Sequence, residues 1–102
     1  MLQGRFFVKQ DLQGPPGFAH GGVLASALDE AMGLAVNRAG LAYTAELKLD
    51  LRAMAPVGTY VQVTARVERR EGRKHWAAAE LCGVDEGLVA SGRALFVEPE
   101  PV

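Results

Sequence analysis

The sequence is poor in the residues that build disulfides and metal sites. It has one cysteine, Cys82, and two histidines, His20 and His75, among 102 residues. One cysteine cannot form an internal disulfide, so we expect a reducing, cytoplasmic location. The spacing of these three residues matches no zinc pattern, and no metal or other cofactor is expected. The motif Gly-x-Ser-x-Gly is also absent, which argues against a serine hydrolase with a nucleophile elbow.

Strong charge and long apolar runs are lacking too. The formal net charge is −1, which argues against non-specific binding to nucleic acid or to acidic membranes. No uncharged run is long enough to span a bilayer, and no basic leader with an apolar run opens the chain. Because 49% of the residues are hydrophobic, a folded protein is expected. The length suits one domain over residues 1–102, with 99–102 as a loose tail.

The most informative stretch is an apolar segment rich in small residues, 17–36. It reads as one buried helix with almost no solvent face, interrupted only by Asp29 and Glu30. At a helical period one side is bulky, and a second stripe is small apart from the aspartate: Gly22, Ala25, Ser26, Asp29 and Gly33. Two interpretations stay open. The stripe packs against a neighbouring element with Asp29 hydrogen-bonded there, or it positions Asp29 for chemistry.

The start of this helix offers backbone donors. His20-Gly21-Gly22 places two residues without side chains in the first turn, where N–H groups have no partner inside the helix. A developing oxyanion could reach them, although a flexible junction would have the same sequence. Gly21 and Asp29 are eight positions apart, about 12 Å along the helix, so one carbonyl cannot contact both. If both act, they come from different chains, which predicts a homodimer with shared sites.

The rest of the chain has the alternation typical of strands. A short β-like run at 4–12 leads into a Pro-Pro turn at 13–17, and Gly40 is expected to end the helix. Four further strands are expected, at 42–52, 61–68, 75–84 and 88–98. The segment 69–74 is predicted to be a polar hairpin loop. The fold class is therefore α+β, with an antiparallel sheet of about five strands wrapped around one central helix.

Three further side chains have simpler interpretations. His75 is expected to be a surface residue of a strand, and Trp76 to pack. Cys82 has no base near it in the sequence and is predicted to be a small buried residue.

These features together resemble the small hotdog-fold acyl-CoA thioesterases of the phenylacetate-degradation type. The resemblance runs from about Phe6 to Val97 and rests on Gly17-x-x-His20-Gly21-Gly22, Asp29, Gly40, Thr44-x-Glu46-Leu47 and Pro56-Val57-Gly58. It implies a hotdog fold and hydrolysis of an acyl-CoA thioester to free acid and CoA. It also implies a dimer, often a tetramer, with sites at the dimer interface.

The resemblance assigns roles to individual residues. The carboxylate matching Asp29 activates water or attacks the thioester, and the backbone N–H matching Gly21 stabilises the oxyanion. The histidine matching His20 orients or polarises the thioester, and the hydroxyl matching Thr44 holds the attacking water. The remaining substrate-binding candidates are Gly22, Ser26, Gly33, Gln13, Arg69 and Arg70. The two arginines are candidates for holding CoA phosphates, with a solvated hairpin tip as the alternative.

One position departs from the family pattern. Many relatives carry asparagine or glutamine six positions before the histidine, where this chain has Gly14, and the neighbouring Gln13 is the candidate substitute. This departure keeps a second hypothesis open, a non-catalytic acyl-CoA binding protein of the same fold. A dehydratase of this fold is less well supported, because no histidine follows Asp29 closely.

Overall fold

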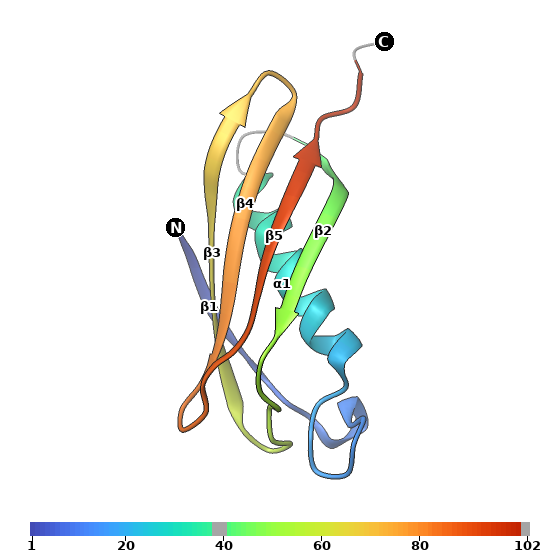
Figure 1. Ribbon diagram of the computed structural model, residues 1–102, viewed down its shortest axis with the longest axis vertical. Coiled ribbons are helices and arrows are strands. Elements are labelled where there is room, and N and C mark those ends of the chain that lie inside the picture. The colour runs from blue at the N-terminus through green and yellow to red at the C-terminus, as the bar shows by residue number, and fades with distance from the viewer. Residues whose placement is uncertain (38–40, 101–102) are drawn as a thin grey trace.

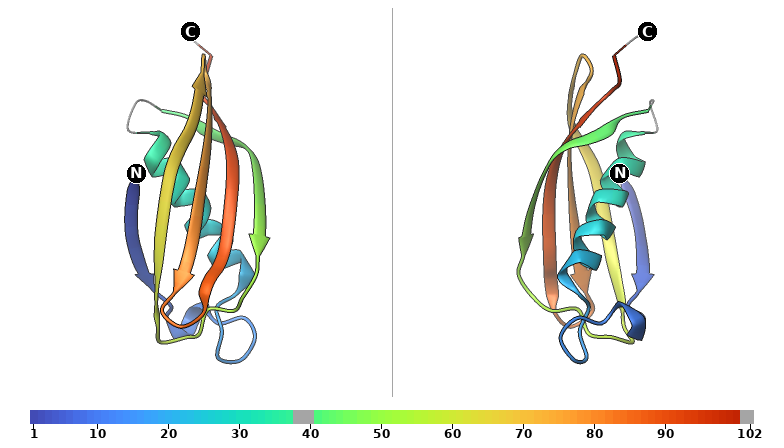
Figure 2. Two further views of the ribbon diagram at one scale, coloured as in Figure 1. Left: turned by 60° about the vertical axis from the view of Figure 1, so that its left-hand side comes forward. Right: turned by 90° about the vertical axis from the view of Figure 1, so that its right-hand side faces the viewer.

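A computed structural model describes residues 1–37 and 41–100, in which one sheet curves around one helix (Figures 1 and 2). The elements follow the chain as β1 (Leu2–Phe7), a short 3-10 helix (Gln10–Leu12), α1 (Gly21–Val36), β2 (Tyr43–Leu51), β3 (Tyr60–Glu71), β4 (Lys74–Gly83) and β5 (Gly87–Val97). Neighbouring strands are all antiparallel, in the order β1-β3-β4-β5-β2. This arrangement confirms the predicted α+β hotdog fold and leaves β1 and β2 at the two edges.

Small residues on the inner face of the sheet let α1 lie close to it. Ala77 and Ala79 of β4 are buried in one core cluster with Leu28 and Met32 of α1. At Gly92 of β5, an added Cβ would lie 3.3 Å from Cε of Met32, so glycine leaves room for that side chain. Large side chains on the helix thus fill the space above small ones on the sheet, and this packing sets the distance between α1 and the sheet.

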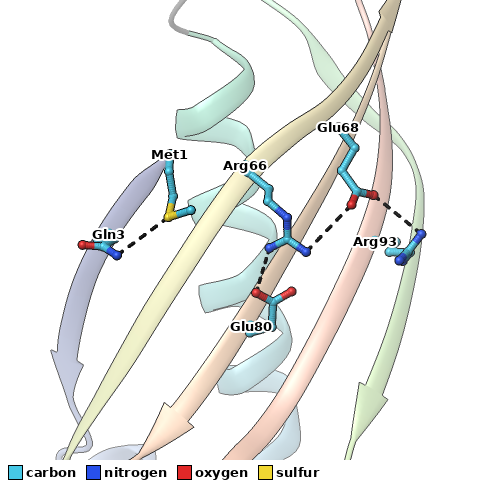
Figure 3. Close-up of polar contacts among 6 residues, drawn as sticks. All are labelled: Met1, Gln3, Arg66, Glu68, Glu80 and Arg93. Carbon is cyan, nitrogen blue, oxygen red and sulfur yellow. Dashed lines mark hydrogen bonds and ion pairs between the residues drawn. The ribbon is translucent and has the colours of Figure 1, made fainter.

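The outer face of the sheet is charged. Arg66 of β3 donates to Glu80 of β4 at 2.8 Å and lies 3.8 Å from Glu68, whose carboxylate is 3.6 Å from Arg93 (Figure 3). The hydrogen bond to Glu80 raises the pKa of Arg66 above its ordinary value, so this guanidinium stays charged. The alternation of charged and apolar residues along β3 therefore decides which face of the sheet covers α1.

The helix is less enclosed than the sequence predicted. The sheet covers its bulky side, whereas Gly22, Ser26 and Glu30 are exposed and Leu34 is 58% exposed. Within the described residues α1 begins at Gly21 and ends at Val36, so the segment 17–19 belongs to a loop rather than to the helix. The predicted helix end at Gly40 lies outside the described residues. One side of α1 is therefore open in a single protomer.

Two predictions around the β3–β4 hairpin were wrong. Strand pairing continues to Glu71 and Lys74, so the segment 69–74 is mostly strand, with a tight turn at Gly72 (φ +59°). His75 is 6% exposed rather than a surface residue. It lies two positions before the buried Ala77 and therefore on the same, core-facing side of β4, a pattern that the sequence already contained. Cys82 is partly rather than fully buried.

The segment after β5 is bonded to this hairpin. The Glu98 carboxylate lies 2.7 Å from Nε2 of His75, and the Glu98 N–H donates to the carbonyl of Arg73 at 2.8 Å. Arg73 also lies 3.7 Å from the Glu100 carboxylate. Residues 98–100 thus leave the sheet, as expected from their prolines, but Glu98 and Glu100 contact the hairpin rather than hanging free.

Candidate active site

His20 caps the N-terminus of α1 with its side chain. Its backbone is extended (φ −67°, ψ 140°), and Nδ1 accepts a hydrogen bond from the Gly22 N–H at 2.9 Å. The His20 carbonyl accepts from the N–H groups of Val23 (3.0 Å) and Leu24 (3.4 Å). Because Nδ1 is an acceptor, the neutral ring carries its proton on Nε2. Among the described residues, the Gly21 N–H is then the one first-turn donor without a partner.

A closed loop holds the backbone of His20. The His20 N–H donates to the carbonyl of Leu12 at 2.9 Å. Within the loop, Oε1 of Gln13 accepts from the Gly17 N–H at 2.7 Å, and Gly17 has φ +85°, which favours glycine. The side-chain oxygen of Gln13 therefore closes the loop. Only the side-chain amide nitrogen of Gln13 remains free to replace the asparagine or glutamine that many relatives carry near the thioester.

Gly14 lies directly against His20. A Cβ added at Gly14 would be 2.9 Å from Cα of His20 and 3.2 Å from the ring carbon Cδ2. The first distance is shorter than real Cβ atoms show, so a larger residue at position 14 would displace His20. The departure from the family pattern at this position is thus coupled to the close packing of the histidine.

Asp29 is paired with Thr44 on the side of α1 that faces β2. The Thr44 hydroxyl donates to Oδ1 of Asp29 at 2.8 Å, and the aspartate is only partly buried. A bulge between Thr44 and Glu46 shifts the register of β2 against β5 and so aims Thr44 toward the helix. Oδ2 of Asp29 has no protein partner among the described residues. Asp29 and Thr44, both predicted site residues, are therefore brought together, with one carboxylate oxygen left for a ligand or water.

Gly21 lies at the other end of β2. A Cβ at Gly21 would be 3.3 Å from Cδ1 of Leu51, the last residue of the strand. A cleft of about 290 Å³ opens at this point and is lined by Pro15, Ala19, Gly21, Leu24, Leu51, Arg52, Ala53 and Met54. The two halves of the predicted site, Gly21 and Asp29, thus both face the β2 edge, but at opposite ends of it.

The other predicted substrate residues fall into two places. Gly22 and Ser26 line a hollow of about 570 Å³ between α1 and β1, together with His20 and Glu30. Gly33 instead lies under the ring of Phe96, whose Cε2 would be 3.6 Å from an added Cβ. Gly33 therefore allows α1 to pack against β5, whereas Gly22 and Ser26 line the hollow beside His20.

Arg69 and Arg70 do not lie near Gly21 in this protomer. They belong to the β3–β4 hairpin, at the opposite end of the molecule from the start of α1 (Figure 1). The Arg69 guanidinium lies 3.9 Å from the centre of the Trp76 ring, and Arg70 donates to Nδ1 of His75 at 2.6 Å. Both cations already have partners within the hairpin.

Three residues of the Gly21 cleft were missed by the sequence interpretation: Leu51, Arg52 and Met54. Two of them are apolar yet half exposed, at 50% for Leu51 and 54% for Met54. The alternation that ends at Leu51 was visible, but Met54 lies beyond β2, and the position of these residues beside the helix start depends on β2 lying at the sheet edge, which a pattern of residue types does not specify.

Neither a metal site nor a membrane helix is found in the part of the chain that the structure describes. Residues 1–37 and 41–100 contain no group of three histidine, cysteine, aspartate or glutamate residues placed to hold an ion. Over the same residues no helix combines the length and apolar character needed to cross a bilayer. The groups described at the site are a carboxylate, a hydroxyl, an imidazole and a backbone N–H.

The chain is similar to named thioesterases in sequence. It is 36% identical over 89 residues to the acyl-coenzyme A thioesterase THEM4 of Xenopus laevis, covering 85% of this chain and 40% of that protein. It is 36% identical over 89 residues to THEM5 of Homo sapiens, covering 85% of this chain and 36% of that protein. The chain thus spans about 40% of the length of the THEM4 relatives that it matches.

Solved structures show the same fold, and a family model matches most of the chain. The BH2602 protein of Bacillus halodurans, solved with CoA, has a TM-score of 0.85 at 26% identity, covering 93% of this chain and 65% of that one. The PaaI protein of E. coli has a TM-score of 0.90 at 21% identity, covering 98% and 73%. A model described as the thioesterase superfamily matches residues 16–90. This chain therefore belongs to the thioesterase superfamily.

Proposed function

We propose that the protein hydrolyses acyl-CoA thioesters at two sites, each shared between two copies of the chain. Asp29 of one copy is the base or nucleophile, and the N–H of the partner's Gly21 stabilises the oxyanion. The observation that carries this proposal is the placement of the two groups at opposite ends of one edge strand. Asp29 is bonded to Thr44 near the start of β2, and Gly21 contacts Leu51 at its end.

Antiparallel pairing of two β2 strands would join these halves. Leu47 is the middle residue of the nine in β2. If the two-fold axis passes beside it, Thr44 of one copy lies opposite Asp50 of the other, next to the partner's Leu51. Each Asp29 then lies at the Gly21 end of the second copy, in two identical sites. The large exposed side chains along this strand support such a contact, with Tyr43 at 55%, Leu47 at 40% and Leu51 at 50% exposure.

In the general-base route, Oδ2 of Asp29 takes a proton from water while the water oxygen attacks the thioester carbon. The carbonyl π electrons move to oxygen, where the N–H of the partner's Gly21 donates to the new oxyanion. The carbonyl then re-forms, the C–S bond breaks, and the proton on Asp29 passes to the departing CoA thiolate. The Thr44 hydroxyl holds Oδ1 throughout, which keeps Oδ2 directed at the water.

In the nucleophilic route, Oδ2 attacks the thioester carbon itself and CoA thiolate leaves, which forms an acyl-aspartyl anhydride. Water then cleaves the anhydride and releases the acid. In a single turnover in heavy-oxygen water, label found in Asp29 shows this route, because only water that attacks the aspartyl carbonyl of the anhydride leaves its oxygen there. The same side chains serve both routes.

His20 and its neighbours orient the substrate in this proposal. With Nδ1 bonded to Gly22, Nε2 presents its N–H outward, where it donates to the thioester beside the partner's Asp29. Gly22 and Ser26 line the hollow next to this ring and contact the bound substrate, as does the amide nitrogen of Gln13. The similar proteins named as acyl-coenzyme A thioesterases and the CoA-bound Bacillus halodurans structure support the substrate class. We also propose a cytoplasmic location, in keeping with the single cysteine.

A second candidate is an acyl-CoA binding protein without turnover. Gly14 carries no polar side chain, and the carbonyl oxygen of Gln13 is used inside its own loop. If the family's amide at this position is needed for turnover, the protein would bind acyl-CoA and release no thiol.

Thiol release from a panel of acyl-CoAs tests the reaction. The wild type should release free CoA, whereas Asp29→Asn should bind the same acyl-CoA but release no free CoA. Tight binding by both proteins with no thiol release would favour the binding protein.

The Gly21 N–H can be removed by substitution. Gly21→Pro removes the donor at the first helical position, where proline is tolerated, and His20 already has the extended backbone that precedes proline. Gly21→Ala is the matched control, since it adds a Cβ near Leu51 but keeps the N–H. We expect kcat of the proline variant to fall about 100- to 1000-fold, and the alanine variant to be far less affected.

Mixing Asp29→Asn with Gly21→Pro tests whether the site is shared. Neither variant alone has a complete site, but each mixed dimer has one. After co-refolding at equal amounts, about one quarter of wild-type activity should return, because half of the dimers are mixed. Activity that stays at the level of the single variants would show that each site lies within one chain.

A further inference from the structure

The Gly21 cleft carries one cation, Arg52. It follows Leu51, the last residue of β2, and its backbone is anchored to β5, since the N–H groups of Arg52 and Ala53 both donate to the carbonyl of Val89, at 2.8 and 3.0 Å. The other residues that line the cleft are apolar or glycine. A guanidinium is therefore held at an otherwise apolar cleft that Gly21 also lines.

Asp50 orients this guanidinium by bonding to only one of its three nitrogens. Nε of Arg52 donates to Oδ2 of Asp50 at 2.7 Å, and the two side chains are 61% and 54% exposed. A pair this exposed adds little to stability. The terminal nitrogens of Arg52 have no partner among the described residues, so their N–H groups remain for a ligand. A guanidinium held through Nε presents these groups as the planar fork that matches phosphate oxygens.

We infer that Arg52 binds a phosphate group of the CoA carrier, an inference that rests on the proposed function. The acyl group is apolar and the nucleotide of CoA is strongly anionic. A cation at one rim of the site therefore orients the substrate with its nucleotide at that rim. The thioester carbonyl lies between the Gly21 N–H and the partner's Asp29, and the CoA carrier extends from it along the cleft past Arg52.

Arg69 provides a matched comparison. Its side chain is 62% exposed, against 61% for Arg52, and each pairs with a carboxylate two residues away in sequence, Glu71 in the case of Arg69. Arg69 lies on the β3–β4 hairpin over the Trp76 ring, far along the molecule from Gly21 (Figure 1). The two arginines thus have similar exposure, but Arg69 also stacks on Trp76, whereas the terminal nitrogens of Arg52 have no partner among the described residues.

Kinetics with two carriers test the inference. The same acyl group is presented as its CoA thioester and as its pantetheine thioester, which has no phosphate. Arg52→Ala should raise KM for the CoA thioester about 10- to 100-fold and leave kcat and the pantetheine KM near wild type. Arg52→Lys should recover part of the loss, since it keeps the charge without the fork. Binding of CoA and of dephospho-CoA by calorimetry then tells the ribose phosphate from the diphosphate.

Three outcomes would overturn the inference. One is an equal rise in KM for both carriers, which would mean that Arg52 shapes the cleft. Another is no change with Arg52→Ala, and the third is a selective rise with Arg69→Ala, which would place the phosphates at the hairpin. Because calorimetry measures CoA binding without turnover, Arg52 remains testable even if the wild type proves not to hydrolyse acyl-CoA.

Discussion

At the residue scale, His20 caps the helix through Nδ1, and in the proposed site its Nε2–H orients the thioester. Replacing it with alanine removes both functions, whereas asparagine can still accept from the Gly22 N–H through its side-chain oxygen. We expect His20→Ala to lower the free energy of unfolding by about 1 kcal/mol and His20→Asn to recover most of that loss. Both variants should hydrolyse acyl-CoA slowly, because neither has an imidazole.

Urea unfolding and kcat, measured on the same two proteins, separate these functions. An asparagine variant as unstable as the alanine variant would show that the Nδ1 contact does not cap α1. An asparagine variant with wild-type kcat would show that the ring makes no contribution to the reaction beyond the cap.

The same scale shows what could be inferred from residue types. Gly21 and Asp29 could be proposed from spacing, because helix periodicity converts sequence separation into distance along one axis, whereas His20 was proposed from the family resemblance. That Gly14 packs against His20, and that Gln13 closes its own loop, could not be proposed in this way. Both depend on how an irregular loop folds back on itself, which no period describes.

At the scale of elements, the C-terminal segment is bonded to the β3–β4 hairpin through a buried histidine. Arg70 can only donate, so Nδ1 of His75 accepts from it and Nε2–H donates to Glu98 at 2.7 Å. Glu98→Ala would leave the buried Nε2–H without a partner, and we expect a loss of about 1–3 kcal/mol in the free energy of unfolding. Glu100, 83% exposed in a 3.7 Å ion pair, is the control.

Chemical denaturation of Glu98→Ala and Glu100→Ala measures this difference. The second variant should stay within about 0.5 kcal/mol of wild type, since exposed ion pairs contribute little. Equal stability of the two variants would mean that the contact between His75 and Glu98 adds nothing to the fold.

The elements also show which parts of the fold can be predicted from the pattern of residue types. Alternation along β2 to β5 and the small, apolar character of α1 predicted the sheet and the central helix. The limits of the β3–β4 hairpin were missed because polar residues from Arg69 to Lys74 look like a loop, although they pair across the strands. The order β1-β3-β4-β5-β2 joins segments far apart in sequence, so the approach of Arg52 to Gly21 follows from topology rather than from any local signal.

At the scale of the whole molecule, charge and exposed apolar surface lie in different places. The outer face of the sheet carries the ion pairs of Arg66 and Arg93 (Figure 3), whereas the edge strand β2 exposes Leu47 and Leu51. An unpaired strand edge with apolar side chains favours pairing with another chain. In the proposed dimer this edge separates Asp29 from Gly21 of its own chain, so the surface that favours association is also the one at which each shared site would be completed.

A charge at the middle of β2 should therefore abolish assembly and activity together. In a pair centred on Leu47, Leu47→Glu places two carboxylates beside the two-fold axis, where they repel. Val84→Glu is the control, because Val84 is 87% exposed in the β4–β5 turn, away from this edge. Light scattering should show monomers for Leu47→Glu and wild-type assembly for Val84→Glu, with helix and strand signals kept in both. Thiol release should be lost only in the first variant, since its Asp29 has no second Gly21 to meet. A monomeric Leu47→Glu protein that still hydrolyses acyl-CoA at the wild-type rate would mean that one chain holds the entire site.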